Sequence, residues 1–187
     1  MVYELRIELK GANPKILRKV QVNSDLSLHE LHHIIQISIG WTNSHLYSFI
    51  IDEIEYSLKD YDYDNHKYGN AKAYRLKEFK NEPIEYLYDF GDYWEHSVQI
   101  LKEIEGDRLL HPKCIEGEGT CPPEDVGGIH GFEEFKEIMK DKTHPERESY
   151  IEWYGSVFDP NEINLEEINQ QLANLKEYIQ EIESDSE

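Results

Sequence analysis

Aromatic and acidic side chains gather in one short stretch of the chain, Tyr86–His96, around a single glycine, Gly91. A second stretch, Cys121–Gly128, combines two prolines, two carboxylates and two glycines. Rigid turn residues that carry carboxylates are typical of a site held on a scaffold, not of a buried strand. The search for chemistry therefore begins with these two stretches.

The side chains and glycines of these stretches, with one histidine that follows them, form a candidate ligand-binding set. Its members are Asp89, Asp92, Trp94, His96, Glu124, Asp125, Gly127, Gly128 and His130. If the two stretches meet, the clustered carboxylates raise one another's pKa and can hold a divalent cation or act as acid and base. The alternative is structural, with the aspartates shaping their turn and the other acids capping a helix. The sequence assigns no catalytic residue, no metal and no cofactor.

Strands on both sides of Gly91 would place the Asp89–Asp92 turn at one end of a sheet. Pro122 and Pro123 stiffen the second stretch, and its two glycines allow backbone N–H groups to approach a ligand closely. We therefore expect the turn and the Pro122–Gly128 loop to lie side by side, with Trp94 and His96 between them.

Three other motifs are weaker evidence for a functional site. His29–His33 satisfies the H-E-x-x-H pattern of zinc peptidases, but it begins in the first turn of a predicted helix, where Glu30 already serves as a capping partner. On a helical wheel His29 and His33 point away from the apolar stripe, so we expect them to face water. Asp89–Gly91 spells the magnesium-binding triplet of protein kinases without the other kinase motifs. Cys114 and Cys121 are too far apart for a zinc knuckle, but His111 and His130 flank them, so a Cys/His zinc site is an alternative to two structural loop cysteines.

Periodicity and capping signals predict the elements that position the candidate residues. They give a hairpin from Tyr3–Leu9 and Ile16–Val22, a helix from Ser27 to Gly40, strands at Leu46–Ile51, Ile84–Tyr88 and Trp94–Ile104, and helices at Gly131–Lys140, Pro145–Tyr154 and Asn164–Ile182. Asp60–Asn70 reads as a surface loop, and the segment from Gly106 to Gly131 as irregular.

The expected fold is α+β: an N-terminal β-hairpin, helix and strand, then a mixed or antiparallel sheet covered by helices, with further helices at the C-terminus. No linker-like segment interrupts the apolar faces, so residues 1–182 are predicted to form one domain. Residues 183–187 are predicted to be a disordered acidic tail.

The formal net charge of −20 limits the partners of the chain. Such a charge repels phosphate backbones and anionic lipid headgroups, so we expect neither nucleic-acid nor membrane binding. It favours a cation or a basic protein or peptide partner. With two cysteines and no apolar run long enough to cross a bilayer, the chain is expected to be cytoplasmic.

Several short motifs resemble, in order, the pattern of a known family. They are Leu31-His32-x-x-Ile35-Gln36, Gly40-Trp41, His45-Leu46-x-x-Phe49, Tyr88-Asp89-Phe90-Gly91-Asp92-x-Trp94-x-His96, Pro122-Pro123-Glu124-Asp125-x-Gly127-Gly128 and Phe158-Asp159-Pro160. Together they resemble the plasmid pRiA ORF-three-like family, which is similar to the TnpR-like passenger protein of certain insertion elements.

The resemblance runs from about Tyr3 to Leu172 and implies a compact α+β fold. It implies no activity, substrate or cofactor, so it carries over no catalytic residue. His32, His45 and His96 fall within the family pattern, whereas His29 and His33 fall outside it. The acidic Asp60–Asn70 loop is a departure from the pattern.

Three functions remain open at this point. The first is a non-enzymatic module that binds a protein or peptide through an aromatic and acidic groove. The second is an acid–base or metal-assisted hydrolase that uses Asp89, Asp92 and His96 with Glu124, Asp125 and His130. The third is a nucleic-acid accessory protein of a mobile element, which requires a basic patch around Arg6, Lys15, Arg18 and Lys19. We favour the first.

Overall fold

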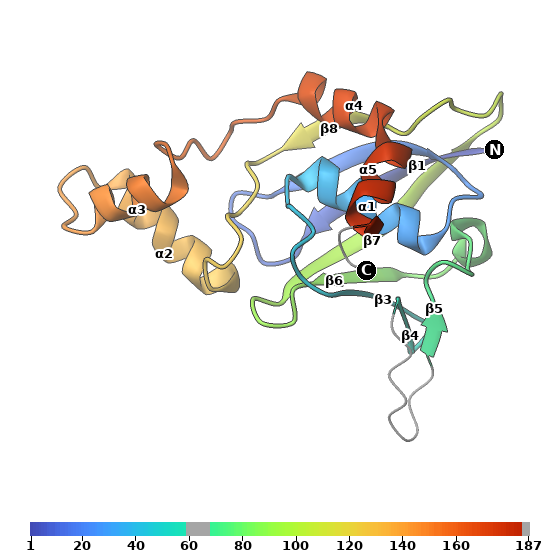
Figure 1. Cartoon of the computed structure of the whole chain (residues 1–187), viewed down its shortest axis with the longest axis horizontal. Helices are drawn as coiled ribbons and strands as arrows, with labels where there is room; N and C mark the ends of the chain where they lie inside the picture. The colour runs from blue at the N-terminus through green and yellow to red at the C-terminus, as the bar shows by residue number, and fades with distance from the viewer. Residues whose placement is uncertain (59–67, 185–187) are drawn as a thin grey trace.

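A computed structural model describes residues 1–58 and 68–184 of the chain, and these form one curved sheet with helices packed along it (Figure 1). The strands are β1 (Val2–Leu9), β2 (Leu17–Asn23), β3 (Tyr47–Ile51), β4 (Ile54–Ser57), β5 (Tyr68–Asn70), β6 (Ile84–Tyr88), β7 (Trp94–Ile104) and β8 (Lys113–Glu118). The helices are α1 (Leu28–Ile39), the 3-10 turn η1 (Leu76–Phe79), α2 (Gly128–Lys140), α3 (Arg147–Tyr154), α4 (Leu165–Ala173) and α5 (Leu175–Ser184).

The eight strands form one mixed sheet in the order β5-β4-β3-β6-β7-β1-β2-β8. Neighbouring strands are antiparallel except β4 and β5, which run parallel. β1 pairs with β7 from Val2 opposite Ile104 to Leu9 opposite His96, which joins the N-terminal hairpin to the central one. The predicted α+β class, with a mixed sheet and C-terminal helices, is confirmed.

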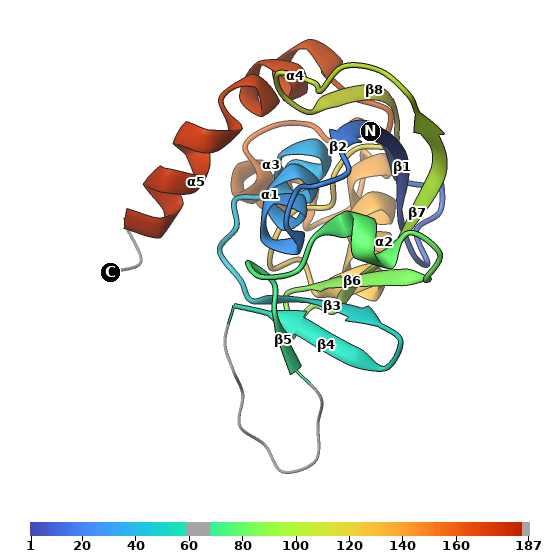
Figure 2. The same ribbon diagram turned by 90° about the vertical axis from the view of Figure 1, so that its right-hand side faces the viewer.

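α1 packs against the concave face of the sheet, which curves around it (Figure 2). The predicted capping box is present: the Ser27 hydroxyl accepts from the Glu30 N–H, and the Glu30 carboxylate accepts from the Ser27 N–H. Gly40, at φ 118°, ends the helix in the left-handed region that glycine adopts without strain. The local signals therefore define both ends of α1.

The burial of α1 corrects one prediction. His29 and His33 do not face water, because only 5% and 1% of their surfaces are exposed. Both α4 and α5 contact α1, and the Tyr178 ring of α5 lies edge-on to the ring of His33, with 5.7 Å between the ring centroids. A helical wheel of α1 alone cannot show that a second layer covers its polar side.

The C-terminal half departs from the expected elements in three places. The segment expected to be irregular contains β8, which pairs with β2. The helix expected over Asn164–Ile182 is divided at Asn174 into α4 and α5, with Leu172 and Leu175 buried on either side of the break. α5 continues to Ser184, so the first two residues of the expected disordered tail are helical.

Two expectations concern segments that the structure describes only in part. Residues 59–67, most of the expected acidic loop, and residues 185–187 lie outside the described residues. Tyr68–Asn70, at the end of that loop, forms β5. No helix within residues 1–58 and 68–184 is long and apolar enough to cross a membrane.

Candidate functional site

The turn between β6 and β7 is built around Asp89, whose backbone adopts a positive φ of 57°. Its carboxylate oxygen Oδ1 accepts a hydrogen bond from the N–H of Gly91 at 2.8 Å. Its own N–H donates to the carbonyl of Leu46 at 2.9 Å, and its carbonyl accepts from the N–H of Tyr93. Asp89 therefore shapes its turn, as expected if its role is structural. Its second carboxylate oxygen, Oδ2, is directed towards His45.

The Pro122–Gly128 loop lies directly beside this turn. The Gly127 N–H donates to Asp92 Oδ2 at 3.1 Å. Gly128, at φ 67°, lies so close to the turn that a Cβ atom there would be 2.4 Å from the carbonyl oxygen of Asp92. The structure thus brings together the two stretches that the sequence singled out.

Glu124 organises the segment between α1 and β3. Its carboxylate accepts from the hydroxyls of Tyr88 and Thr42. The Tyr88 oxygen in turn accepts the backbone N–H groups of Ser44 and His45, at 3.0 and 3.3 Å. Burial, and then the neighbouring Glu124 carboxylate, raise the pKa of Tyr88, so this hydroxyl stays protonated. The network fixes the backbone that presents His45.

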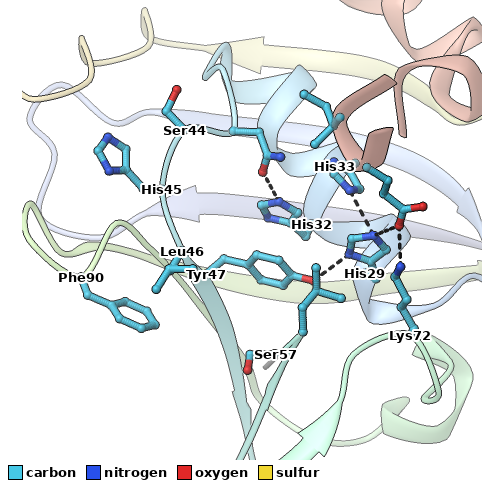
Figure 3. A pocket seen from close by; sticks show the side chains of 14 residues that line it. His29, His32, His33, Ser44, His45, Leu46, Tyr47, Ser57, Lys72 and Phe90 are labelled. Atoms are coloured by element: carbon cyan, nitrogen blue, oxygen red, sulfur yellow. Dashed lines mark hydrogen bonds and ion pairs between the residues drawn. The ribbon is translucent and has the colours of Figure 1, made fainter. Parts of the chain in front are cut away.

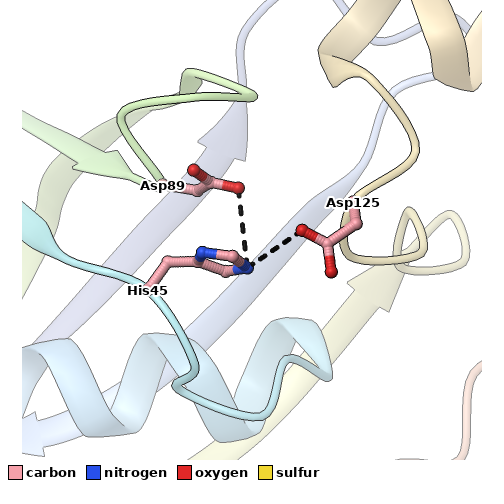
Figure 4. Close-up of side chains that lie close together, drawn as sticks. All are labelled: His45, Asp89 and Asp125. Carbon is pink, nitrogen blue, oxygen red and sulfur yellow. Dashed lines mark ion pairs between the residues drawn. The ribbon is translucent and has the colours of Figure 1, made fainter.

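His45, Asp89 and Asp125 meet at one corner of the molecule (Figure 4). His45 Nε2 lies 3.7 Å from Asp89 Oδ2 and 3.3 Å from Asp125 Oδ1. One donor atom from each residue lies within 4.8 Å of the other two, and no other group of three or more His, Cys, Asp or Glu side chains in the described residues converges this tightly. The Asp89 side chain is 9% exposed, that of His45 27% and that of Asp125 75%.

This corner has two chemical states. A protonated His45 can bridge the two carboxylates as an ion pair. A neutral His45 can join them as a one-nitrogen, two-oxygen ligand set, which suits a divalent transition metal and leaves coordination positions open to a ligand. We refer to His45, Asp89 and Asp125 as the acidic corner.

Three side chains of the candidate set, those of Trp94, His96 and His130, are not part of the corner. Trp94 and His96 are fully buried core residues of β7, so neither side chain is exposed to a ligand. His96 Nδ1 lies 3.0 Å from the Trp94 carbonyl, and burial lowers the pKa of His96 to about 4. His130 is an exposed residue of α2.

The residues that the sequence reasoning did not select are His45, Tyr88 and Thr42. His45 and Tyr88 do lie in the short motifs that carry the family resemblance, which is the signal that was available. Tyr88 precedes the turn by one residue, and His45 precedes a predicted strand by one residue. Thr42 had no distinguishing sequence signal.

A cavity of about 720 Å³ opens beside the corner (Figure 3). Its lining residues come from α1, the segment into β3, the ends of β4 and α5, and two turns: His29, His32, His33, Asn43, Ser44, His45, Leu46, Tyr47, Ser57, Leu58, Lys72, Phe90, Ile182 and Glu183. The His32 ring stacks on Tyr47 with centroids 3.6 Å apart, and its Nδ1 lies 2.8 Å from the Tyr86 hydroxyl. His45 belongs both to this cavity and to the acidic corner.

The fold and site define an α+β protein in which a histidine-lined cavity adjoins a His–Asp–Asp corner at the end of a mixed sheet. The chain belongs to the plasmid pRiA4b ORF-3-like family, whose sequence profile matches residues 1–167.

Two similar proteins extend this assignment. The chain is 34% identical over 178 residues to the uncharacterised protein y4hQ of Sinorhizobium fredii, a match that covers 93% of this chain and 92% of that one. It is also similar to a crystal structure of a protein of unknown function, MM3350, from Methanosarcina mazei Go1. That structure has a TM-score of 0.78 and 30% identity, over 88% of this chain and 96% of that one.

Proposed function

We propose that the protein is a non-enzymatic binding module that takes a basic peptide segment into the cavity, with the acidic corner receiving its cationic group. The observation that carries this proposal is the adjoining position of cavity and corner, which share His45. The cavity volume of about 720 Å³ lies in the range of sites that enclose a small ligand or a short peptide segment.

The surroundings of the cavity support this chemistry. Phe90 and Tyr93, on the turn that carries Asp89, are 43% and 57% exposed, so aromatic surface adjoins the carboxylates. A cationic side chain gains from both neighbours, through ion pairing with the carboxylates and cation–π contact with the rings. The net charge of −20 adds a long-range attraction for a basic partner.

The test uses a fluorescein-labelled hexapeptide of alternating arginine and phenylalanine, followed by fluorescence anisotropy at about 0.15 M salt. Because a chain of this charge attracts any basic peptide weakly, matched variants are essential. Asp125→Asn and Phe90→Ala should each weaken binding about tenfold, the equivalent of about 1.4 kcal/mol. Glu134→Gln removes the same charge from the exposed face of α2 and should leave binding within a factor of two. Equal weakening by Asp125→Asn and Glu134→Gln would reduce the interaction to net charge and refute the proposal.

The geometry also favours a second candidate, a metal-assisted hydrolase centred on the acidic corner. It differs from the sequence-based version, because His45, and neither His96 nor His130, is the histidine that converges with the carboxylates. In this function a divalent ion at the corner would activate water for attack. Mn²⁺ binding followed by electron paramagnetic resonance tests it: Asp125→Asn must abolish tight binding, and the Mn²⁺-loaded protein must hydrolyse an activated ester faster than that variant.

We do not propose the nucleic-acid function. The basic patch that it requires is not presented as free charge: Arg18 is buried, Lys19 pairs with Glu116, and Arg6 and Lys15 pair with Glu8.

A further inference from the structure

Two histidines on the buried side of α1 face one another across the wall of the cavity. His29 and His33 are one helical turn apart, and their Nε2 atoms are separated by 3.3 Å (Figure 3). Both side chains are more than nine-tenths buried. Glu183, near the end of α5, places Oε1 3.1 Å from His29 Nε2.

We infer that His29 Nε2 and His33 Nε2 bind a Zn²⁺ ion at the wall of the cavity, with the Glu183 carboxylate as the third ligand. A histidine pair at positions i and i+4 of a helix is the usual half-site for zinc. Two nitrogens 3.3 Å apart, each about 2.1 Å from zinc, subtend an angle of about 105° at the ion. A tetrahedral site requires about 109°, so the pair needs little rearrangement to bind zinc.

Proton placement in the metal-free protein supports this inference. Two imidazole nitrogens that face one another can share only one proton. If His29 Nε2 carries it, His33 is left with its proton on Nδ1, a buried atom with no hydrogen-bond partner in the described residues. If His33 Nε2 carries it, His29 Nε2 turns a lone pair towards the Glu183 carboxylate. A cation between the two nitrogens removes the conflict at Nε2, because both lone pairs then point at the metal. It leaves the His33 proton on Nδ1, so the support comes from the facing Nε2 atoms and the nearby Glu183 carboxylate.

The remaining contacts suit metal ligands. His29 Nδ1 lies 2.8 Å from the Tyr47 hydroxyl, the kind of outer contact that orients a ligating imidazole. Glu183 is the adjustable member: its carboxylate is 42% exposed and is held by Lys72 Nζ at 2.6 Å. These three ligand atoms do not all lie within 4.8 Å of one another, so Glu183 must rotate towards His33 to complete the site.

The site is not that of a zinc peptidase. In such an enzyme the glutamate of the motif activates the metal-bound water. Here the Glu30 carboxylate accepts from the N–H and the hydroxyl of Ser27 and caps α1. The proposed zinc instead ties the end of α5 to α1 and leaves a fourth coordination position towards the cavity. It is independent of the peptide-binding function proposed above.

The experiment titrates Zn²⁺ into metal-free protein by isothermal calorimetry and records the Co²⁺ absorption spectrum as a measure of coordination geometry. We expect one zinc ion per chain and a tetrahedral Co²⁺ spectrum. His29→Gln and His33→Gln should each weaken zinc binding by about 100-fold or more, and Glu183→Gln by about tenfold. His130→Gln, at an exposed position, and His45→Gln, at the acidic corner, should leave it unchanged.

Three outcomes would overturn the inference. They are absence of micromolar zinc binding, unchanged binding in both His29→Gln and His33→Gln, and loss of binding in His45→Gln, which would move the ion to the acidic corner. If the buried histidine variants do not fold, nitrogen-15 NMR of the histidine rings in the wild-type protein identifies the zinc ligands. Zinc must then shift Nε2 of His29 and His33 and leave His45 unmoved, and the reverse pattern refutes the assignment.

Discussion

The guanidinium of Arg18 is buried, and it donates hydrogen bonds to four backbone carbonyls. Nε donates to the Ser38 carbonyl at 2.7 Å, and Nη1 and Nη2 donate to carbonyls of Leu17, Glu118 and Gly119 at 2.8 to 3.0 Å. One side chain therefore joins the end of α1, β2 and the end of β8. The rigid fork of arginine suits this role, because it presents several donors in fixed directions.

Replacement of Arg18 should show how much these hydrogen bonds contribute to the free energy of unfolding. Arg18→Met leaves four backbone carbonyls without their donor, three of them in buried contacts, so it should lower the free energy of unfolding by about 3 kcal/mol. Arg18→Lys should recover only part of the loss, since a single ammonium cannot reach all four. Urea denaturation measures both. Arg108→Met, at an exposed residue that pairs with Asp25, is the control and should cost less than about 0.5 kcal/mol. Equal losses at the two positions would contradict this account.

His96 provides a pH-dependent term in stability. Burial lowers the pKa of its folded-state ring to about 4, below the unfolded value of 6.5. As pH falls from 6.5 to 4 the unfolded chain binds a proton that the folded chain does not, so stability decreases over this window. Between pH 7 and pH 5 the loss due to His96 should be about 2 kcal/mol.

His96→Phe removes this group and provides the measurement. The difference in unfolding free energy between pH 7 and pH 5 should be smaller in the variant than in the wild-type chain, whatever the variant's absolute stability. All other titrating groups, including the buried histidines of α1, remain in both proteins and cancel in the comparison. His111→Gln, at an exposed histidine, should retain the wild-type pH dependence. A His96→Phe variant with the same pH dependence as the wild type would refute the assignment.

At the scale of elements, the close approach of the turn and the loop depends on Gly128. Both Gly128 and Gly155 have positive φ, 67° and 89°, but only at Gly128 would a Cβ atom meet backbone, the Asp92 carbonyl at 2.4 Å. Gly155→Ala therefore measures the conformational cost alone, about 1 kcal/mol. Gly128→Ala adds a clash that the backbone must relieve, and it should cost about 2 kcal/mol more in urea denaturation. Equal costs would mean that the turn and the loop can separate freely.

The sequence predicts the elements whose signals are local. The capping box at Ser27 and the glycine at position 40 define α1, and residue alternation defines the strands of both hairpins. β8 was missed because its pattern is interrupted by glycine and is stabilised by pairing with β2. The burial of His29 and His33 was missed for a similar reason, because it depends on α5, which is far away in sequence.

The candidate site was also predictable only where its signals were local. Two turn-rich stretches flanking a sheet end were expected to meet, and they do, through Asp92 and Gly127. The burial of His96 was missed although a local signal existed: His96 alternates with Trp94 and Val98 along β7, and that face is buried. The contribution of His45 could not be derived from spacing, because its backbone is held by a hydrogen bond to Tyr88, 43 residues further along the chain.

At the scale of the whole molecule, the predicted single domain implies one cooperative unfolding transition. The described strands form one sheet, in which β1 lies between β2 and β7. If either half of the chain were removed, strands of the other half would lose a pairing partner. The core also continues from the sheet through α1 to Leu172 on α4. Calorimetry should give one transition, with equal calorimetric and van't Hoff enthalpies.

Leu172→Ala tests this coupling from one edge of the core. The side chain is fully buried, so the substitution should cost about 2–4 kcal/mol. Tryptophan fluorescence reports on Trp41 and Trp94, buried near the candidate site, and on the half-exposed Trp153 of α3, whereas far-ultraviolet circular dichroism reports on all elements. In one cooperative domain both urea midpoints fall together. If Leu172→Ala shifts the dichroism midpoint and leaves the fluorescence midpoint in place, the C-terminal helices unfold separately from the sheet and the chain contains two units.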